Sequence, residues 1–156
     1  MNWKNVFFVL HSAESPKVMK EFTRIVIEGF DKDNLVLSRV MGSATKGIEQ
    51  ASKDCFKNQK NLLIIKDLDD LKELINLDRI YLFPPPQYSK GMIDLAEVSG
   101  FIKEGKNIAF VFGGGKVSGL TRKELEAGEA VKITERDIGP LGCASILVYE
   151  LERLIS

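Results

Sequence analysis

Short apolar runs alternate with segments of helical periodicity along the chain, and this alternation constrains the fold more than any other feature. The apolar runs occupy residues 6–10, 35–40, 61–65, 79–83 and 107–112, with a sixth short run at 130–134. Such runs predict buried strands. Because strands separated by helices favour a parallel arrangement, we expect an α/β fold, with helices on both faces of a mostly parallel sheet.

The segments between these runs carry helix signals. Ser15 followed by Pro16 predicts the start of a helix that extends to Phe30, since a hydroxyl caps the first turn and proline suits its first position. Its apolar face consists of Val18, Phe22, Ile25 and Val26. Further helices are expected at residues 45–58, 67–77, 89–103, 121–127 and 140–155. The length of 156 residues suits a single domain over residues 1–156.

Composition limits the classes of partner. Lys plus Arg number 22 and Asp plus Glu number 22, so net charge gives no general attraction to nucleic acid or to anionic membranes. Two isolated cysteines, Cys55 and Cys143, and a single histidine predict no zinc site and no other metal site. The run at residues 6–10 is too short for a signal peptide, and no run is long enough to span a membrane. We expect a cytoplasmic protein.

Three predicted strand ends are rich in proline or glycine: residues 84–88, 113–120 and 138–145. In open parallel sheets, ligands bind beyond the carboxyl ends of the strands, and glycine lets backbone approach a ligand closely. The loop at 113–120 is not a P-loop, because Val117 follows Lys116 where a hydroxyl is needed. It is not a dinucleotide fingerprint either, because Ser118 stands at the third glycine position. The pattern predicts a small-molecule site of another kind.

The C-terminal third resembles the SpoU branch of the SPOUT superfamily of S-adenosylmethionine-dependent RNA methyltransferases. In order, the matching motifs read Val111-Phe112-Gly113-Gly114-Gly115, Ser118-Gly119-Leu120-Thr121, Glu124-Leu125, Val131-Lys132-Ile133 and Ala144-Ser145-Ile146-Leu147-Val148-Tyr149-Glu150-Leu151. The chain is most similar to a small archaeal SpoU-like group, some members of which have been labelled nucleases.

The resemblance implies a deep C-terminal trefoil knot, a homodimer, and S-adenosyl-L-methionine bound in a bent shape between three loops. The function that it implies is methylation of RNA, with a ribose 2'-hydroxyl of tRNA or rRNA as acceptor. The cofactor-binding residues that it implies are Leu82, Phe83, Pro84, Phe112, Gly113, Gly114, Gly115, Gly119, Leu120, Ile138, Leu141, Gly142 and Cys143.

Catalytic and RNA-binding candidates lie mainly in the N-terminal part. Arg24 is expected within a few residues of the family's catalytic arginine, and His11 ends the first strand, where it is a catalytic candidate or a structural histidine. Lys17 and Lys20 share a helical face with Arg24, and are read either as phosphate contacts or as a solvated surface. Two more RNA-binding candidates lie near the pocket loops, Lys116 and Arg136.

Three departures from the family pattern keep alternatives open. Lys116 stands where the family usually has a glutamate, and the N-terminal signature Asn-x-Gly-x-x-x-Arg is absent. The last loop reads Ile138-Gly139-Pro140-Leu141-Gly142, where the family usually has Ser-Leu-Asn. One alternative is therefore a catalytically inactive protein that binds S-adenosylmethionine and RNA. A second is a metal-dependent nuclease built on Asp94 and the triplet Glu104-Gly105-Lys106, which loosely fit the acid and Glu-x-Lys pattern of restriction-type enzymes.

Overall fold

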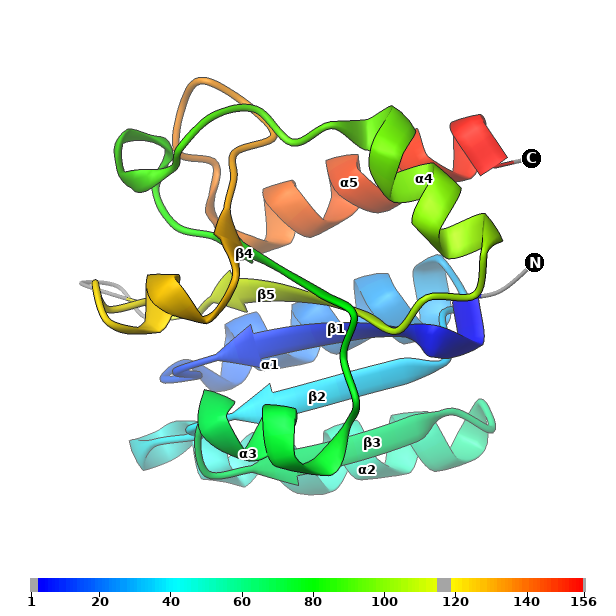
Figure 1. Cartoon of the computed structure of the whole chain (residues 1–156). Helices are drawn as coiled ribbons and strands as arrows, with labels where there is room; N and C mark the ends of the chain where they lie inside the picture. The colour runs from blue at the N-terminus through cyan, green and yellow to red at the C-terminus, as the bar shows by residue number, and fades with distance from the viewer. Residues whose placement is uncertain (1–2, 115–118, 156) are drawn as a thin grey trace.

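The computed structural model describes residues 3–114 and 119–155. Its sheet has six strands in the order β3-β2-β1-β5-β4-β6, and every ladder between them is parallel. The strands are β1 (Val6–His11), β2 (Asn34–Ser38), β3 (Asn61–Ile65), β4 (Arg79–Phe83), β5 (Ile108–Gly113) and β6 (Glu129–Ala130). The predicted mostly parallel sheet is confirmed. The arrowheads of β1, β2 and β5 point to the left in Figure 1, where the loops of the candidate sites gather.

Helices cover both faces of this sheet, as predicted. The helices are α1 (Pro16–Thr23), α2 (Ile48–Lys57), α3 (Leu68–Leu74), α4 (Leu95–Lys103) and α5 (Gly139–Ile155). On one face, α1, α2, α4 and α5 enclose the larger core around Phe8, Phe110 and Phe112. On the other face, α3 packs through Leu68 and Leu71 over Val36, and Figure 1 shows it in front of the sheet. Within the described residues, no helix is both long enough and apolar enough to span a membrane.

The central strands are buried on both sides, which explains their continuous apolar sequence. Val9 and Val111 point to the α3 side, whereas Phe8 and Phe110 point to the larger core. All four side chains are fully buried. Parallel strands covered on both faces need such unbroken apolar runs, and this is why the strand positions could be predicted closely.

The first helix begins where the sequence predicts. Oγ of Ser15 accepts a hydrogen bond from the amide of Val18 at 3.2 Å, and Pro16 is the first helical residue. After Thr23 the helix widens into a π-helix, η2 (Arg24–Gly29), so the helical path reaches the expected end near Phe30.

The helix predicted at residues 89–103 is six residues shorter than expected, because α4 begins at Leu95. The preceding segment instead pairs with the chain around β6. The amide of Lys90 donates to the carbonyl of Ala130 at 2.9 Å, and that of Ile93 donates to the carbonyl of Lys132 at 3.0 Å. This pairing also explains why the strand predicted at 130–134 shortens to β6 and an isolated bridge between Met92 and Lys132.

Three short 3-10 helices matter for the sites: η3 (Gly42–Gly47), η4 (Pro86–Tyr88) and η5 (Glu124–Ala127). The first replaces the opening turn of the helix predicted at 45–58, so α2 starts at Ile48. Within the region predicted as 121–127, only η5 is helical.

Candidate functional site

Three loops converge at the carboxyl edge of β4 and β5 and enclose a cavity of about 120 Å³, here called the proline–glycine cavity. One wall comes from the proline run after β4, a second from the residues that flank the glycine loop after β5, and a third from the segment before α5 together with the start of α5 itself. Its lining residues are Phe83, Pro84, Pro85, Pro86, Gly113, Gly119, Leu120, Lys132, Ile133, Thr134, Asp137, Gly139, Pro140 and Cys143.

Six residues predicted to bind a cofactor line this cavity: Phe83, Pro84, Gly113, Gly119, Leu120 and Cys143. Leu82 and Phe112 instead lie fully buried in the sheet, on its two opposite sides. The other predicted residues in the described part of the chain, which neighbour the cavity in sequence without lining it, are Gly114, Ile138, Leu141 and Gly142. Gly115 and Lys116 fall outside the described residues.

The second wall depends on the absence of side chains. A Cβ atom placed on Gly119 would lie 2.2 Å from Cα of Gly113, a separation that backbone atoms cannot tolerate. Glycine at both positions therefore lets the two ends of the loop touch. At Gly139 the situation differs, because its φ of +74° favours glycine while a Cβ there would meet only open space.

The cavity combines apolar walls with groups of both charges. Nζ of Lys132 lies 2.9 Å from Oε2 of Glu135, and Oδ1 of Asp137 accepts the amide of Gly139 at 3.0 Å. The three consecutive prolines have no amide donors, and the carbonyls of Pro85 and Pro86 accept hydrogen bonds within the turn, so Pro84 offers the carbonyl acceptor of this wall. Burial raises the pKa of the Cys143 thiol to about 11, so this side chain is neutral. Such a lining suits a ligand that carries both charges and an amino donor.

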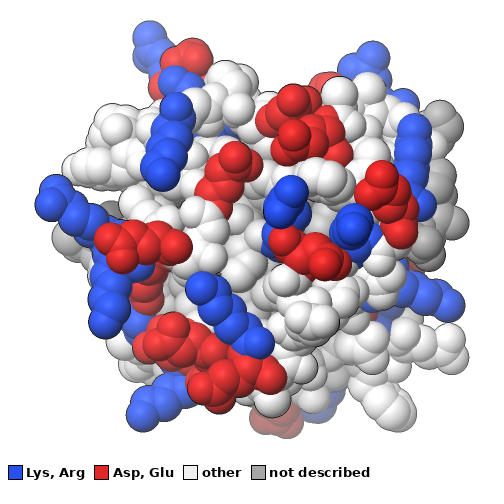
Figure 2. All heavy atoms as spheres, viewed as in Figure 1, with Lys and Arg blue, Asp and Glu red and all other residues white. Residues whose placement is uncertain are grey.

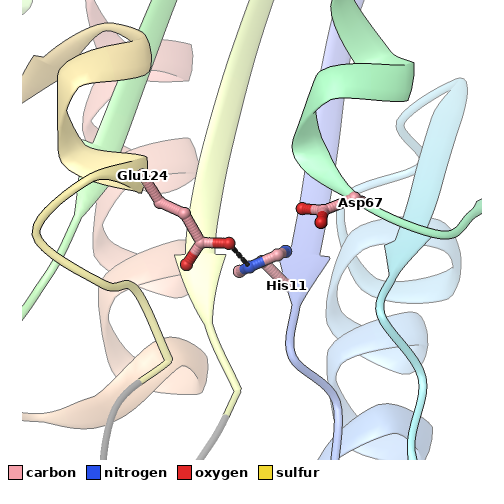
Figure 3. A group of neighbouring side chains, drawn as sticks. All are labelled: His11, Asp67 and Glu124. Atoms are coloured by element: carbon pink, nitrogen blue, oxygen red, sulfur yellow. Dashed lines mark hydrogen bonds and ion pairs between the residues drawn. The ribbon is translucent and has the colours of Figure 1, made fainter.

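A second group of polar side chains lies beside the cavity, at the ends of β1, β2 and β3. We call it the His11–Glu124 cluster; it consists of His11, Ser38, Arg39, Asp67 and Glu124. Figure 3 shows that His11 comes from the end of β1, Asp67 from the start of α3 and Glu124 from η5, and that they point toward one another. Nε2 of His11 lies 2.7 Å from Oε2 of Glu124, and Nδ1 lies 2.8 Å from Oγ of Ser38.

Hydrogen bonding favours one tautomer of the neutral His11 ring. Because the Glu124 carboxylate can only accept, Nε2 carries the proton and Nδ1 accepts from the Ser38 hydroxyl. Burial lowers the pKa of His11, and this effect outweighs the attraction of Glu124, which raises it. The ring is fully buried and neutral, with both nitrogens engaged.

Arg39 supplies the positive charge of the cluster. Its guanidinium donates to Oε2 of Glu124 at 2.6 Å and to Oδ1 of Asp67 at 3.0 Å. Burial works to raise the pKa of Glu124, but the Thr121 amide, His11 and Arg39 outweigh it, so the pKa is lowered. Asp67 behaves alike, because the Leu68 amide and Arg39 outweigh burial and lower its pKa. Both carboxyl groups are therefore ionised at neutral pH.

The cluster is also a possible ligand set for a cation. One donor atom each from His11, Asp67 and Glu124 lies within 4.8 Å of the others. Imidazole nitrogen with two carboxylates suits a divalent transition metal. Arg39 already bridges both carboxylates, however, so a metal ion can bind there only after the guanidinium moves away. The sequence-based expectation of no metal site considered the numbers of cysteine and histidine residues. Those numbers do not show that one histidine and two carboxylates lie close together in the fold.

The remaining predicted residues are not brought together. Arg24 lies on the helical segment after α1, where its side chain is 68% exposed and contacts Glu21 at 3.5 Å. It belongs neither to the cavity nor to the cluster. Lys17, Lys20 and Arg136 are exposed. Figure 2 shows one face of the molecule, on which basic and acidic side chains alternate rather than gather by sign.

The acid and Glu-x-Lys pattern considered for a nuclease does not assemble. Asp94 caps the start of α4 by accepting the Glu97 amide at 3.0 Å, whereas Glu104 caps its end. Ten residue steps of helix separate them by roughly 15 Å. These two carboxylates cannot bind one metal ion together.

Sequence reasoning missed Arg39, Asp67 and Glu124 as site residues. Arg39 directly follows β2 and Asp67 lies two residues after β3, so the rule that pointed to the other strand ends could have found them. Glu124 was recognised only as part of a family motif. Its partners lie 85 and 113 residues away in sequence, and no local pattern predicts such contacts.

Comparison with known sequences identifies the family. Residues 42–150 match the family model described as RecB-family nuclease (DUF2122). A protein of Methanocaldococcus jannaschii, by name a candidate type II restriction enzyme, is 33% identical over 153 residues, which cover 97% of this chain and 99% of that protein.

Comparison with solved structures identifies the fold. A probable methyltransferase from Bordetella pertussis Tohama I has a TM-score of 0.75 at 16% identity, covering 99% of this chain and 98% of that one. The TrmH/SpoU tRNA modifying enzyme of A. aeolicus has a TM-score of 0.63 at 15% identity, covering 96% of this chain and 75% of that one. The resemblance to SpoU-type proteins is therefore confirmed for the fold. The chain belongs to the family described as RecB-family nuclease (DUF2122), and it has the fold of the SpoU-type RNA methyltransferases.

Proposed function

We propose that the protein binds S-adenosyl-L-methionine in the proline–glycine cavity and methylates a ribose 2'-hydroxyl of tRNA or rRNA. One observation carries this proposal: the three loops that the sequence singles out meet around one cavity. The fold shared with SpoU-type enzymes supports it. The deep trefoil knot and the homodimer that accompany this kind of site are part of the proposal.

The residues of the cavity suit this cofactor. The carbonyl of Pro84 can accept from an adenine amino group, while those of Pro85 and Pro86 hold the turn together, and the proline rings offer apolar contact. Asp137 suits a positive sulfonium or ammonium group, and Lys132 suits a carboxylate. Bound S-adenosylmethionine supplies an electrophilic methyl group, so the protein's main task is to hold the acceptor in line with it.

The two catalytic candidates differ in what they can do. The engaged nitrogens of His11 give it a positioning role, in which it holds Glu124 and thereby the loop next to Leu120. Arg24 is exposed and can reach an RNA phosphate or hydroxyl, as can Lys17 and Lys20 on α1. Arg136 and Lys116 complete the proposed RNA contacts, the latter in residues 115–118.

Transfer of a labelled methyl group tests this function. The full chain is incubated with S-adenosylmethionine carrying a tritiated methyl group and with bulk tRNA or rRNA, and the digested RNA is analysed for 2'-O-methylnucleosides by mass spectrometry. Incorporation at the ribose is the expected result. Cofactor binding without incorporation would instead support an inactive binding protein, and absence of both would contradict the proposal.

A metal-dependent nuclease is the second candidate function. It is favoured by the description of the family, by the name of the M. jannaschii relative, and by the three converging donors of His11, Asp67 and Glu124. Nicking of supercoiled plasmid in Mn²⁺ should then be lost in Glu124→Gln and kept in Glu104→Ala. Failure of the wild-type chain to cut DNA or RNA in Mg²⁺ or Mn²⁺ would reject this candidate.

A further inference from the structure

A second hollow adjoins the proline–glycine cavity, and we call it the Tyr88 groove. It has a volume of about 870 Å³ and lies between the turn η4 and the segment that contains η5. Its lining residues include Tyr88, Lys90, Leu120, Arg122 and Leu125. Leu120 lines both the groove and the cavity, so the two hollows share a wall.

Tyr88 presents an aromatic surface to solvent at the edge of the groove. The residue is 62% exposed although it is large and aromatic. Its backbone is nevertheless fixed, because its amide donates to the carbonyl of Pro85 at 2.9 Å and Oγ of Ser89 donates to the carbonyl of Pro86 at 2.7 Å. Two prolines restrict the turn further. The backbone that carries the ring is therefore rigid, and it does not have to become ordered when a planar ligand stacks on the ring.

The groove also carries unpaired positive charge. Lys90 and Arg122 are both exposed, and neither forms an ion pair with any residue in the described parts of the chain. The amide of Lys90 is anchored to the carbonyl of Ala130, which fixes where its side chain starts. Glu126 is the one acidic residue among those that line the groove. An anion is thus favoured over a cation there.

An aromatic platform beside two cations has the chemistry of a site for an unstacked nucleotide. Proteins that bind single-stranded RNA stack bases on aromatic rings and pair phosphates with Lys and Arg. The apolar side chains of Leu120 and Leu125 offer further contact to a base.

We propose that the Tyr88 groove binds one unstacked nucleotide of RNA. The base stacks on Tyr88, and Lys90 and Arg122 bind the adjacent phosphates. This inference rests on the proposed function, since the shared wall at Leu120 brings such a nucleotide to the edge of the cofactor cavity. It adds a recognition site that is separate from the cavity and from the His11–Glu124 cluster.

Fluorescence anisotropy of a labelled single-stranded oligouridylate measures this binding. Stacking of one base contributes about 1–3 kcal/mol, so Tyr88→Ala should weaken binding by roughly 5-fold to 150-fold. Tyr88→Phe keeps the ring and should bind within about 2-fold of the wild type. Phe56→Ala is the matched control, because Phe56 is an 86% exposed aromatic residue on α2 outside the groove.

The phosphate contacts have a separate signature. Lys90→Gln and Arg122→Gln should each weaken binding and reduce the slope of log Kd against log salt by about 0.7, the value for one phosphate on a single strand. Lys57→Gln, an exposed change at the end of α2, should leave the slope unchanged.

Two further measurements separate this proposal from the proposed function. Calorimetry with S-adenosylhomocysteine should give the same affinity in wild type and Tyr88→Ala. If the wild type binds the oligonucleotide but shows no binding of S-adenosylhomocysteine, the cofactor cavity is rejected and the groove is not. The groove proposal is overturned if Tyr88→Ala binds the oligonucleotide as tightly as the wild type does. It is also overturned if size-exclusion chromatography shows that the main effect of Tyr88→Ala is to dissociate a dimer.

Discussion

Nε2 of His11 lies 2.7 Å from Oε2 of Glu124, and 113 residues separate them in the chain. This bond joins the end of β1 to the segment that follows the glycine loop. Oε1 of the same carboxylate accepts the Thr121 amide at 2.9 Å, next to Leu120 in the wall of both hollows. The His11–Glu124 cluster therefore fixes the position of the wall that the cofactor cavity shares with the Tyr88 groove.

Acid should destabilise the protein through this cluster. The pKa of His11 is lowered in the folded state from its ordinary value of 6.5. Below pH 6.5, His11 binds a proton in the unfolded chain but stays neutral in the folded chain. The free energy of unfolding therefore falls as the pH decreases toward the folded pKa, by at most about 1.4 kcal/mol per pH unit. The lowered pKa values of Glu124 and Asp67 add a further loss at pH values below their ordinary 4.5 and 3.8.

Thermal unfolding followed by circular dichroism at several pH values measures this effect. His11→Gln keeps a neutral hydrogen-bonding side chain, so its melting temperature should change less than that of the wild type between about pH 6.5 and 5. Parallel pH profiles for the two proteins would show that His11 does not carry this dependence.

Arg39 should stabilise the fold by neutralising two carboxylates. Arg39→Gln removes the cation between Asp67 and Glu124 and leaves two adjacent negative charges. Since a hydrogen bond to a charged group contributes about 1.5–3 kcal/mol, a decrease of about 2 kcal/mol in the free energy of unfolding is expected. Urea denaturation provides the measurement. Arg24→Gln is the control, because its exposed ion pair should contribute less than about 1 kcal/mol; equal losses in both variants would contradict the assigned role of Arg39.

Gly119 should be intolerant of any side chain. In Gly119→Ala the new Cβ would meet Cα of Gly113 at 2.2 Å, so the loop ends must separate, at a cost of about 1–3 kcal/mol. Differential scanning calorimetry should show a lower melting temperature. Gly91→Ala, whose Cβ meets no atom within 4 Å, should unfold at nearly the wild-type temperature. A wild-type melting temperature in Gly119→Ala would mean that the loop ends do not touch.

Local sequence signals correctly predicted the elements whose position depends on residues close to one another in the sequence. The strands at 61–65 and 79–83 were predicted to the residue, and Ser15 and Pro16 marked the start of α1 correctly. The segment around Met92 was wrongly predicted as helix, because its spacing suits a helix while its backbone pairs with residues 130–132. Pairing across that separation depends on the order of the strands, which local periodicity does not contain.

The two candidate sites also differ in how far local sequence could predict them. Pro84 follows β4 and Gly113 ends β5, so each could be identified from the sequence of a single strand and its loop. The His11–Glu124 cluster exists only because β1 lies between β2 and β5 in the sheet. Arg39 and Asp67 resemble ordinary surface charges until that order is known.

Titration calorimetry with S-adenosylhomocysteine tests the central claim, a cofactor site between the three loops, most directly. The variant Cys143→Phe places a large ring in the proline–glycine cavity, and Leu154→Phe makes a similar change at an exposed position of α5 outside it. We predict saturable binding to the wild type and to Leu154→Phe, with affinity at least about tenfold weaker in Cys143→Phe, a loss of about 1.4 kcal/mol or more. Absence of saturable heat with the wild type, or unchanged affinity in Cys143→Phe, would contradict the claim.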